Sequence, residues 1–346
     1  MFEIDFTFNE PFRLESGELL PEIRLRCTIY GRLNADKSNA ILVFHALTGS
    51  SRVGEWWNGV ICDGCALDTS EHAFVCINYL GSCYGSTSAG SLKKRHRELP
   101  IVTTRDIVRS NELLFEHLGI TKFRAVIGGS VGGMLALQFA ADLPEMADEV
   151  ISIAATPLSA MGLALNHIQR QAIHRNDIEL ARKIAVVSYK SPRQFDERFG
   201  RKPNRNGEDP GKRRRDRFDI GGYLDHQGDR FRDRFELESY DLITKAMDLF
   251  DLTDDDIRRI SAKVSLVGIS SDWLFPASDV RILKERLASY GVDAEYHEII
   301  SDDGHDAFLS DVEETSSVLR RILGRRKCNS TNANKQLTAT AAGCYL

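Results

Sequence analysis

Residues 123–144, FRAVIGGSVGGMLALQFAADLP, constrain the fold of this chain more tightly than any other segment. They begin with an apolar run typical of a buried strand (residues 123–127), pass through a glycine-flanked serine at Ser130, and continue as an amphipathic helix. The pattern G-x-S-x-G in this setting predicts a sharp strand-to-helix turn that projects the serine hydroxyl out of a sheet. Glycines suit such a turn because they avoid steric clashes around the strained serine. A turn that binds phosphate, or that only packs closely, has the same pattern.

Apolar runs that read as strands alternate with segments of helical periodicity along most of the chain. Near-continuous apolar strands separated by helices indicate a mostly parallel sheet that is covered by helices on both faces. The sequence therefore predicts a doubly wound α/β fold. The predicted strands are residues 40–44, 74–77, 123–127, 150–153, 264–269 and 295–300, and the predicted helices are residues 106–118, 133–141, 278–289 and 311–323.

This alternation lapses between about Pro157 and Tyr240. Residues 167–185 have a helical pattern, and the rest is polar and rich in Arg, Asp and Gly, so we interpret the stretch as a helical lid laid over the carboxyl edge of the sheet. Its basic run KRRRDR, Lys212 to Arg217, is typical of a solvated loop, although contact with an anionic substrate or cofactor and a nuclear-localisation patch remain open. The predicted division is residues 1–157 and 243–324 for the core, 158–242 for the lid and 325–346 for a disordered tail.

Composition narrows the class of protein. The chain has 346 residues and a formal net charge of -5, which argues against a general nucleic-acid or membrane binder. No apolar run approaches the length needed to cross a bilayer. The acidic start, MFEIDFTFNEPF, lacks the basic and apolar regions of a signal peptide, so we expect a cytoplasmic protein.

The cysteines give no sign of a metal centre. Seven cysteines are an odd number, which makes a disulfide framework unexpected. Cys62 and Cys65 form one C-x-x-C, but no second pair of ligands follows at a spacing that zinc would need. We therefore expect incidental thiols rather than a metal or redox site.

A serine nucleophile needs a base, and the base needs a carboxylate that orients it. In sheets of this type the chain order is Ser, then Asp or Glu, then His. Asp272, in SSDWLFP, follows the apolar run VSLVGIS, and His305, in SDDGHDAFL, follows EYHEII. Both are expected on loops at the sheet edge where Ser130 emerges, which predicts a Ser130–His305–Asp272 triad.

The segment HALTG, which begins at His45, comes directly after the first strong core strand. Hydrolases of this kind place there a loop that supplies one amide of the oxyanion hole, and the residue after the nucleophile supplies the other. We therefore expect the backbone amides of Leu47 and Val131 to hold the negative charge that develops on a substrate oxygen.

Taken together, several segments resemble the homoserine O-acetyltransferases, a family of acyltransferases of methionine biosynthesis with the α/β-hydrolase fold. They are VFHALTGSS, EWW, LGSCYGST, VIGGSVGGMLALQFA, IQRQAI, AMDLFDL, SSDWLFP and GHDAFL, in order from about Phe2 to Leu323. The resemblance implies a ping-pong mechanism in which Ser130 takes an acyl group from coenzyme A and passes it to an amino-acid hydroxyl.

The resemblance also implies partners and binding residues. Acetyl-CoA, or succinyl-CoA, would be a co-substrate, with no bound cofactor and no metal. Asp306, after the catalytic histidine, would bind the ammonium of the acceptor. Arg217, with Tyr223 nearby in RFDIGGYLDHQG, would bind its carboxylate. Similar proteins dimerise through the helical insertion, so a homodimer is expected.

Three classes of function fit this set of motifs. The favoured one is an acyl-CoA-dependent acyltransferase, with acetyl donor and homoserine acceptor as the commonest family pairing. A succinyl donor or a serine acceptor differs by only a carboxylate or a methylene. An esterase or thioesterase shares the triad and differs in letting water reach the acyl-enzyme. A binding module without activity is the third, and it would not need all three triad residues.

Overall fold

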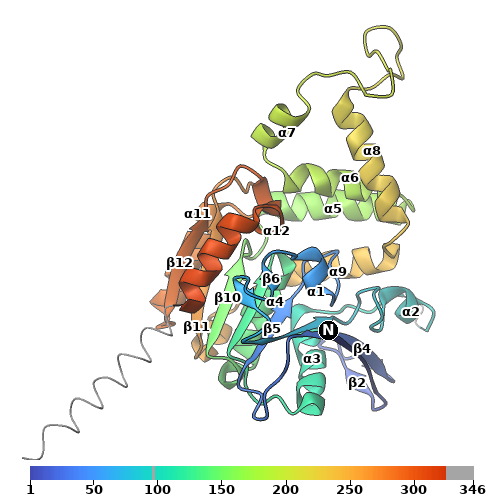
Figure 1. Ribbon diagram of the computed structural model, residues 1–346. Coiled ribbons are helices and arrows are strands. Elements are labelled where there is room, and N and C mark those ends of the chain that lie inside the picture. The colour runs from blue at the N-terminus through green and yellow to red at the C-terminus, as the bar shows by residue number, and fades with distance from the viewer. Residues whose placement is uncertain (96–97, 325–346) are drawn as a thin grey trace, which may run out of the picture.

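The centre of the computed structural model, which describes residues 1–95 and 98–324, is an eight-stranded sheet of order β1-β4-β8-β5-β9-β10-β11-β12 (Figure 1). β4 pairs antiparallel with both β1 and β8, and all other neighbours are parallel. The predicted mostly parallel sheet is therefore confirmed. Its strands are β1 (Phe2–Phe8), β4 (Ile23–Tyr30), β5 (Ala40–Phe44), β8 (Ala73–Asn78), β9 (Ala125–Gly129), β10 (Glu149–Ile153), β11 (Lys263–Ile269) and β12 (Ala294–Ile299). The predicted tail, residues 325–346, lies outside the described residues.

Strands β1 and β4 were not among the predicted strands. Their sequences, FEIDFTF and IRLRCTIY, alternate apolar with polar residues instead of forming an apolar run. That alternation is typical of an antiparallel pair with one face toward water. On the polar side, Arg26 Nε donates to Asp5 Oδ1 at 2.7 Å across the two strands. Smaller strands form two separate pairs, β2 (Phe12–Arg13) with β3 (Leu19–Leu20) and β6 (Ile61–Cys62) with β7 (Leu67–Asp68).

Helices cover both faces of the sheet. Successive residues of β5 point to opposite faces: Leu42 and Phe44 belong to one core cluster, and Ile41 and Val43 belong to another. The first cluster is completed by α3 (Thr104–Leu118), α4 (Val131–Asp142), α10 (Asp254–Arg259) and α11 (Ala277–Ser289). The second is completed by α1 (Val53–Trp56) and by the helix of residues 312–324. This confirms the doubly wound architecture.

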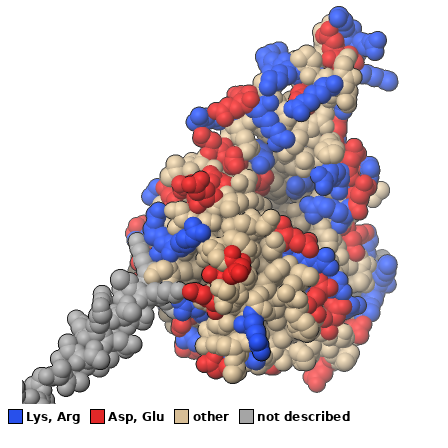
Figure 2. Space-filling model, in the orientation of Figure 1, with Lys and Arg blue, Asp and Glu red and all other residues tan. Residues whose placement is uncertain are grey.

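A group of helices stands above one end of the sheet, at the top of Figure 1. The predicted helix 167–185 is two helices, α5 (Ala160–His174) and α6 (Ile178–Tyr189), because Asn176 has a left-handed backbone (φ 60°) and Asp177 caps α6 by accepting from the amide of Leu180 at 2.8 Å. Lys and Arg side chains gather on the upper part of this group (Figure 2). The other helices of this region are α7 (Pro192–Arg198), α8 (Asp219–Arg232) and α9 (Leu237–Leu249).

The helices α5 to α8 lie within the predicted lid, residues 158–242, whose C-terminal boundary falls inside α9. The division into core and lid stays a prediction. α9 connects the two regions, since the carboxylate of Asp248 on α9 accepts hydrogen bonds from Asn166 (2.9 Å) and Arg170 on α5. The remaining short elements are α2 (Ala89–Lys93), η1 (Pro144–Met146), η2 (Gly304–Asp306) and α12 (Ala307–Ser310).

Candidate active site

Ser130 lies at the turn between β9 and α4, where the sequence predicts it. Its backbone has φ 58° and ψ -129°, a conformation that non-glycine residues rarely adopt and that costs free energy to hold. The flanking glycines permit the turn: a Cβ on Gly128 would lie 2.0 Å from the carbonyl oxygen of Gly132, and a Cβ on Gly132 would lie 2.3 Å from that of Phe44. No side chain larger than hydrogen fits at either position, so the G-x-S-x-G pattern here reflects close packing of backbone.

The three predicted triad residues lie in hydrogen-bonding contact. Ser130 Oγ is 2.8 Å from His305 Nε2, and His305 Nδ1 is 2.6 Å from Asp272 Oδ2. All three are buried, with 6%, 3% and 5% of their surface exposed in the order Ser130, His305, Asp272. This geometry lets the hydroxyl donate to Nε2 while the Nδ1–H donates to the carboxylate.

The carboxylate of Asp272 is fixed by its own loop. Asp272 follows β11, and its Oδ1 accepts from the amides of Leu274 (2.8 Å) and Phe275 (3.0 Å), which leaves Oδ2 for His305. His305 follows β12 in the 3-10 turn η2. The two residues therefore come from the ends of neighbouring parallel strands, and the edge of the sheet brings them together.

The electrostatics of the site favour a proton on His305. Burial disfavours the imidazolium, but the negative charge of Asp272, its hydrogen bond and the more distant charge of Asp306 outweigh burial and raise the pKa of His305 above 6.5. An imidazole of raised basicity is a stronger acceptor for the proton of Ser130.

Two backbone amides near Ser130 are free to receive a substrate oxygen. Val131 is the first residue of α4, so its N–H has no partner within the helix. Leu47 lies in the loop after β5, and among residues 1–95 and 98–324 no backbone or side-chain acceptor contacts its N–H or that of Val131. These are the two amides that the sequence predicts for the oxyanion hole, and that role remains a prediction.

A pocket of about 550 Å³ opens onto Ser130 and His305. Its walls come from the loop after β5, from α1, from α6 and from the segment after α8, so it lies between the carboxyl ends of the parallel strands and the helices that stand above them. Asp306 is at its edge and forms an ion pair with Lys190 (3.1 Å). The lining residues are Ala46, Leu47, Thr48, Gly49, Ser50, Glu55, Trp56, Tyr84, Ser130, Arg182, Tyr189, Arg234, His305, Asp306, Phe308 and Leu309.

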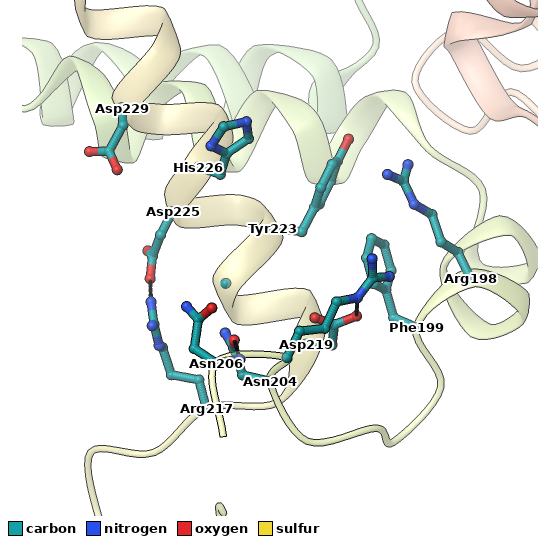
Figure 3. A pocket seen from close by; sticks show the side chains of 12 residues that line it. Arg198, Phe199, Asn204, Asn206, Arg217, Asp219, Tyr223, Asp225, His226 and Asp229 are labelled. Atoms are coloured by element: carbon teal, nitrogen blue, oxygen red, sulfur yellow. Dashed lines mark hydrogen bonds and ion pairs between the residues drawn. The ribbon is translucent and has the colours of Figure 1, made fainter. Parts of the chain in front are cut away.

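The structure does not bring Arg217 and Tyr223 to this pocket. They line a different, polar pocket of about 460 Å³, between α7 and α8 (Figure 3). Arg217 is already engaged there, since its guanidinium forms ion pairs with Glu208 and Asp225. The pattern RFDIGGYL did not reveal this, because it does not show that Arg217 pairs with Asp225, directly after the pattern, and with Glu208, nine residues before it.

Two other arginines line the pocket of Ser130, and sequence reasoning missed both. The guanidinium of Arg182, on α6, lies over the rings of Tyr189 (5.8 Å) and Phe231 (5.1 Å) and has no carboxylate partner within the described part of the chain. Arg234, just after α8, donates to the carbonyl of Thr48 at 3.0 Å. Arg182 carried no usable signal in the sequence, because a basic residue on an amphipathic helix usually faces solvent.

The cysteine pair differs from the expectation. Cys62 and Cys65 are joined in a disulfide, so the prediction of incidental free thiols is wrong for this pair. The reason is local: the amide of Cys65 donates to the carbonyl of Cys62 at 3.3 Å, a turn that places the two Cα atoms 5.1 Å apart. Cys328 and Cys344 lie outside the described residues. The described chain contains no cluster of three or more His, Cys, Asp or Glu side chains suited to a metal ion, and none of its helices is long and apolar enough to span a bilayer.

Comparison with known proteins identifies the family to which the sequence is similar. Residues 39–312 match the family described as alpha/beta hydrolase fold. The chain is 35% identical to the homoserine O-acetyltransferase of Geotalea uraniireducens (strain Rf4), over 94% of this chain and 97% of that protein. Two solved structures share the fold with a TM-score of 0.83: homoserine O-acetyltransferase from Bacillus anthracis (22% identity, covering 93% of this chain and 97% of that one) and esterase E22 (20% identity, 93% and 99%). The fold alone is therefore common to a transferase and an esterase.

Proposed function

The chain belongs to the homoserine O-acetyltransferase family, within the α/β-hydrolase fold, and we propose that it transfers an acetyl group from acetyl-CoA to the side-chain hydroxyl of L-homoserine. The observation that carries the acyl-transfer chemistry is the chain of hydrogen bonds from Asp272 through His305 to Ser130 at the base of a pocket between core and lid. The substrates are supported by the 35% identity to a homoserine O-acetyltransferase over 94% of the chain. The products are O-acetyl-L-homoserine and free coenzyme A, as in the step of methionine biosynthesis that the family resemblance implies.

In the first half-reaction, Ser130 Oγ attacks the thioester carbonyl while its proton passes to His305 Nε2. The carbonyl oxygen becomes negatively charged and accepts hydrogen bonds from the amides of Leu47 and Val131. When this tetrahedral intermediate collapses, the carbon–sulfur bond breaks and the leaving thiolate takes the proton from His305. Free coenzyme A departs, and Ser130 carries the acetyl group as an ester.

In the second half-reaction the roles repeat with a different nucleophile. The homoserine hydroxyl gives its proton to His305 and attacks the ester carbonyl of acetylated Ser130. The same two amides stabilise the oxyanion. The bond to Ser130 Oγ then breaks, Oγ takes the proton back from His305, and the free enzyme is restored.

The charges of the pocket suit an amino acid as acceptor. Asp306 would hold its ammonium group, as the family resemblance implies, and Arg182 would hold its carboxylate in place of Arg217. The support for Arg182 is its position in the same pocket as Ser130. Its guanidinium lies over two aromatic rings and has no carboxylate partner among the described residues, so its hydrogen-bond donors can serve an anion. Asp306 is paired with Lys190, so the acceptor ammonium must share or replace that lysine.

The acetyl donor, the homodimer and the cytoplasmic location are parts of this proposal that rest on the family. A dimer through the lid is supported by apolar side chains on α5 and α6 that are exposed in the single chain. They are Met161 (60% exposed), Ile168 (48%), Leu180 (44%) and Val187 (42%).

A donor–acceptor matrix tests the proposal. Coenzyme A release is followed by thiol titration with acetyl-CoA or succinyl-CoA as donor, and with homoserine, serine or no acceptor. We expect rapid turnover only with acetyl-CoA and homoserine, with one O-acetylhomoserine formed per coenzyme A released. Equal turnover with acetate as product, whether or not homoserine is present, would make the protein a thioesterase. Preference for succinyl-CoA or for serine would keep the mechanism and replace the substrate.

A further inference from the structure

His45 is a completely buried histidine with no part in the proton transfers described above. It follows the last residue of β5, and its ring stacks on that of Tyr79, with ring centroids 4.1 Å apart and planes 17° from parallel. Burial lowers the pKa of His45 to about 4, against a smaller opposite effect of its hydrogen bond to Ala46, so the ring is neutral at physiological pH. A neutral imidazole carries one N–H, which one nitrogen donates.

That N–H has a clear acceptor. His45 Nδ1 lies 2.8 Å from the carbonyl oxygen of Ala46, so Nδ1 is the protonated nitrogen. Its other nitrogen, Nε2, is buried and has no hydrogen-bond partner in the part of the chain that the structure describes. Leaving a buried polar atom unpaired costs free energy, and a phenylalanine would fill the space without that cost. The donor at Nδ1 is therefore the feature that distinguishes histidine here.

The Ala46 carbonyl receives two further hydrogen bonds. The backbone amide of Gly49 donates to it at 2.9 Å, and the hydroxyl of Tyr79 donates at 3.3 Å. Three donors thus converge on one oxygen, which fixes the direction in which this carbonyl points.

The same peptide unit carries the N–H of Leu47. Because the peptide is planar and trans, its C=O and N–H point in opposite directions. The described structure contains no cis peptide. Donors that hold the Ala46 oxygen on one side therefore turn the Leu47 N–H to the other side, and this N–H has no acceptor of its own among residues 1–95 and 98–324. Ala46 and Leu47 both line the pocket that contains Ser130.

We propose that His45 is a positioning residue of the oxyanion hole: through Nδ1, and with the help of Tyr79, it holds the Ala46 carbonyl so that the Leu47 N–H faces the developing oxyanion. The inference rests on the proposed function for the identity of the acyl donor only. Any ester that acylates Ser130 places its carbonyl oxygen in the same hole.

Because the oxyanion hole does not depend on the identity of the acyl donor, the test uses p-nitrophenyl acetate as well as acetyl-CoA. The rate constant for acylation is measured from the pre-steady-state burst of nitrophenolate, and the concentration of ester at half-maximal rate is measured separately. The carbonyl stretch of the acetyl-serine is recorded by isotope-edited infrared difference spectroscopy with ¹³C-labelled acetate ester. Hydrogen bonds to this carbonyl lower its stretching frequency, so the band reports on the amides of Leu47 and Val131 together. A change that follows substitution of His45 or Tyr79 is assigned to Leu47, because neither side chain contacts the peptide of Val131 among the hydrogen bonds of the described residues.

The variants separate positioning from packing. His45→Phe keeps a stacked ring and removes the donor, whereas His45→Asn replaces the ring by an amide whose N–H can take the place of Nδ1–H. Tyr79→Phe removes the longer of the two side-chain bonds. Tyr240→Phe is the control, because it also deletes a buried tyrosine hydroxyl, one bonded to Gln169 rather than to the Ala46 carbonyl.

We expect His45→Phe to slow acylation by about 10²–10³, as loss of one oxyanion donor does, with half-saturation unchanged and the ester band moved to higher wavenumber. Tyr79→Phe should show a smaller change in both quantities, and His45→Asn should recover most of the rate and the band position. An unchanged rate and band in His45→Phe would overturn the inference, as would an equal change in Tyr240→Phe. If His45→Phe does not fold, Tyr79→Phe and Tyr240→Phe decide the question. A slower acylation and a shifted ester band in Tyr79→Phe but not in Tyr240→Phe would support the inference, and equal changes in both would overturn it. A wild-type protein that reacts with the ester and not with acetyl-CoA would refute the proposed function and leave this test intact.

Discussion

The ammonium nitrogen of Lys190 lies 3.1 Å from Oδ2 of Asp306, next to the histidine of the triad. Both side chains are mostly buried, with 14% and 27% of their surface exposed. Asp306 is the N-cap residue of α12, yet its side chain makes no cap hydrogen bond. The carboxylate thus has a lysine as its ion-pair partner in the free protein, and its position fits recognition of an ammonium better than stabilisation of a helix.

This ion pair makes a prediction about the second half-reaction. Asp306→Ala should leave the formation of acetyl-Ser130 close to the wild-type rate and slow its transfer to homoserine, because only the acceptor carries an ammonium. Lys190→Met should have the opposite effect on the acceptor and lower the KM for homoserine by up to about fivefold, since it removes a competing cation worth about 1 kcal/mol. Rapid-quench measurement of the two steps checks both changes. Equal slowing of both steps in Asp306→Ala would leave Asp306 a purely structural role.

Matched variants of Arg182 and Arg217 test which arginine binds the carboxylate of the acceptor. Arg182→Met should raise the KM for homoserine by about 10-fold to 100-fold, the effect of losing a charge-assisted contact of about 1.5–3 kcal/mol. Arg217→Met should leave that KM unchanged, because Arg217 lines the other pocket and pairs with Glu208 and Asp225. Steady-state kinetics with varied homoserine at saturating acetyl-CoA distinguish them. A larger effect in Arg217→Met would restore the assignment that the sequence suggested.

Because His305 contacts both Ser130 and Asp272, we predict that the losses of turnover in Asp272 and His305 variants are strongly non-additive. Asp272→Asn should lower turnover by about 10⁴, because the amide no longer holds the ring in its working tautomer. His305→Ala should cost at least as much, and the double variant little more than the worse single variant, since the residues act as one unit. Circular dichroism controls for folding. Independent, multiplicative losses would show that Asp272 acts on something other than His305.

The raised pKa of His305 predicts the pH dependence of acylation. The neutral ring is the base, so the acylation rate should fall as pH decreases through the pKa of the free enzyme, with a midpoint above 6.5. Asp306 contributes to raising that pKa, and Asp306→Asn should therefore move the midpoint to lower pH. The measurement is the burst rate with p-nitrophenyl acetate between pH 5 and pH 9. A midpoint that stays fixed in Asp306→Asn, or lies below 6.5 in the wild type, would contradict this electrostatic account.

The sequence was most informative where function depends on local backbone. The G-x-S-x-G pattern identifies the turn at Ser130, because backbone atoms approach Gly128 and Gly132 too closely for any side chain. Asp272 and His305 follow strands whose ends must meet at one edge of the sheet. It failed where packing between distant segments decides. Arg182 reaches the pocket only because α6 packs beside the loops that carry Ser130 and His305. Arg217 is engaged by Glu208 and Asp225, and the sequence does not show that these ion pairs form. Strands β1 and β4 were missed because their alternating pattern is weaker than the apolar runs of the parallel core.

The central claim, a covalent acetyl group on Ser130 that homoserine removes, can be tested directly by intact-protein mass spectrometry. The protein is mixed with acetyl-CoA, quenched in acid within seconds, and compared with a sample that receives homoserine before the quench. We predict the added mass of one acetyl group on the wild type, mapped by peptide digestion to Ser130. This mass should be lost on addition of homoserine but not of an equal volume of buffer. Ser130→Ala should show no added mass. Acetylation of Ser130→Ala, or an acetyl group on the wild type that homoserine does not remove, would contradict the proposed mechanism.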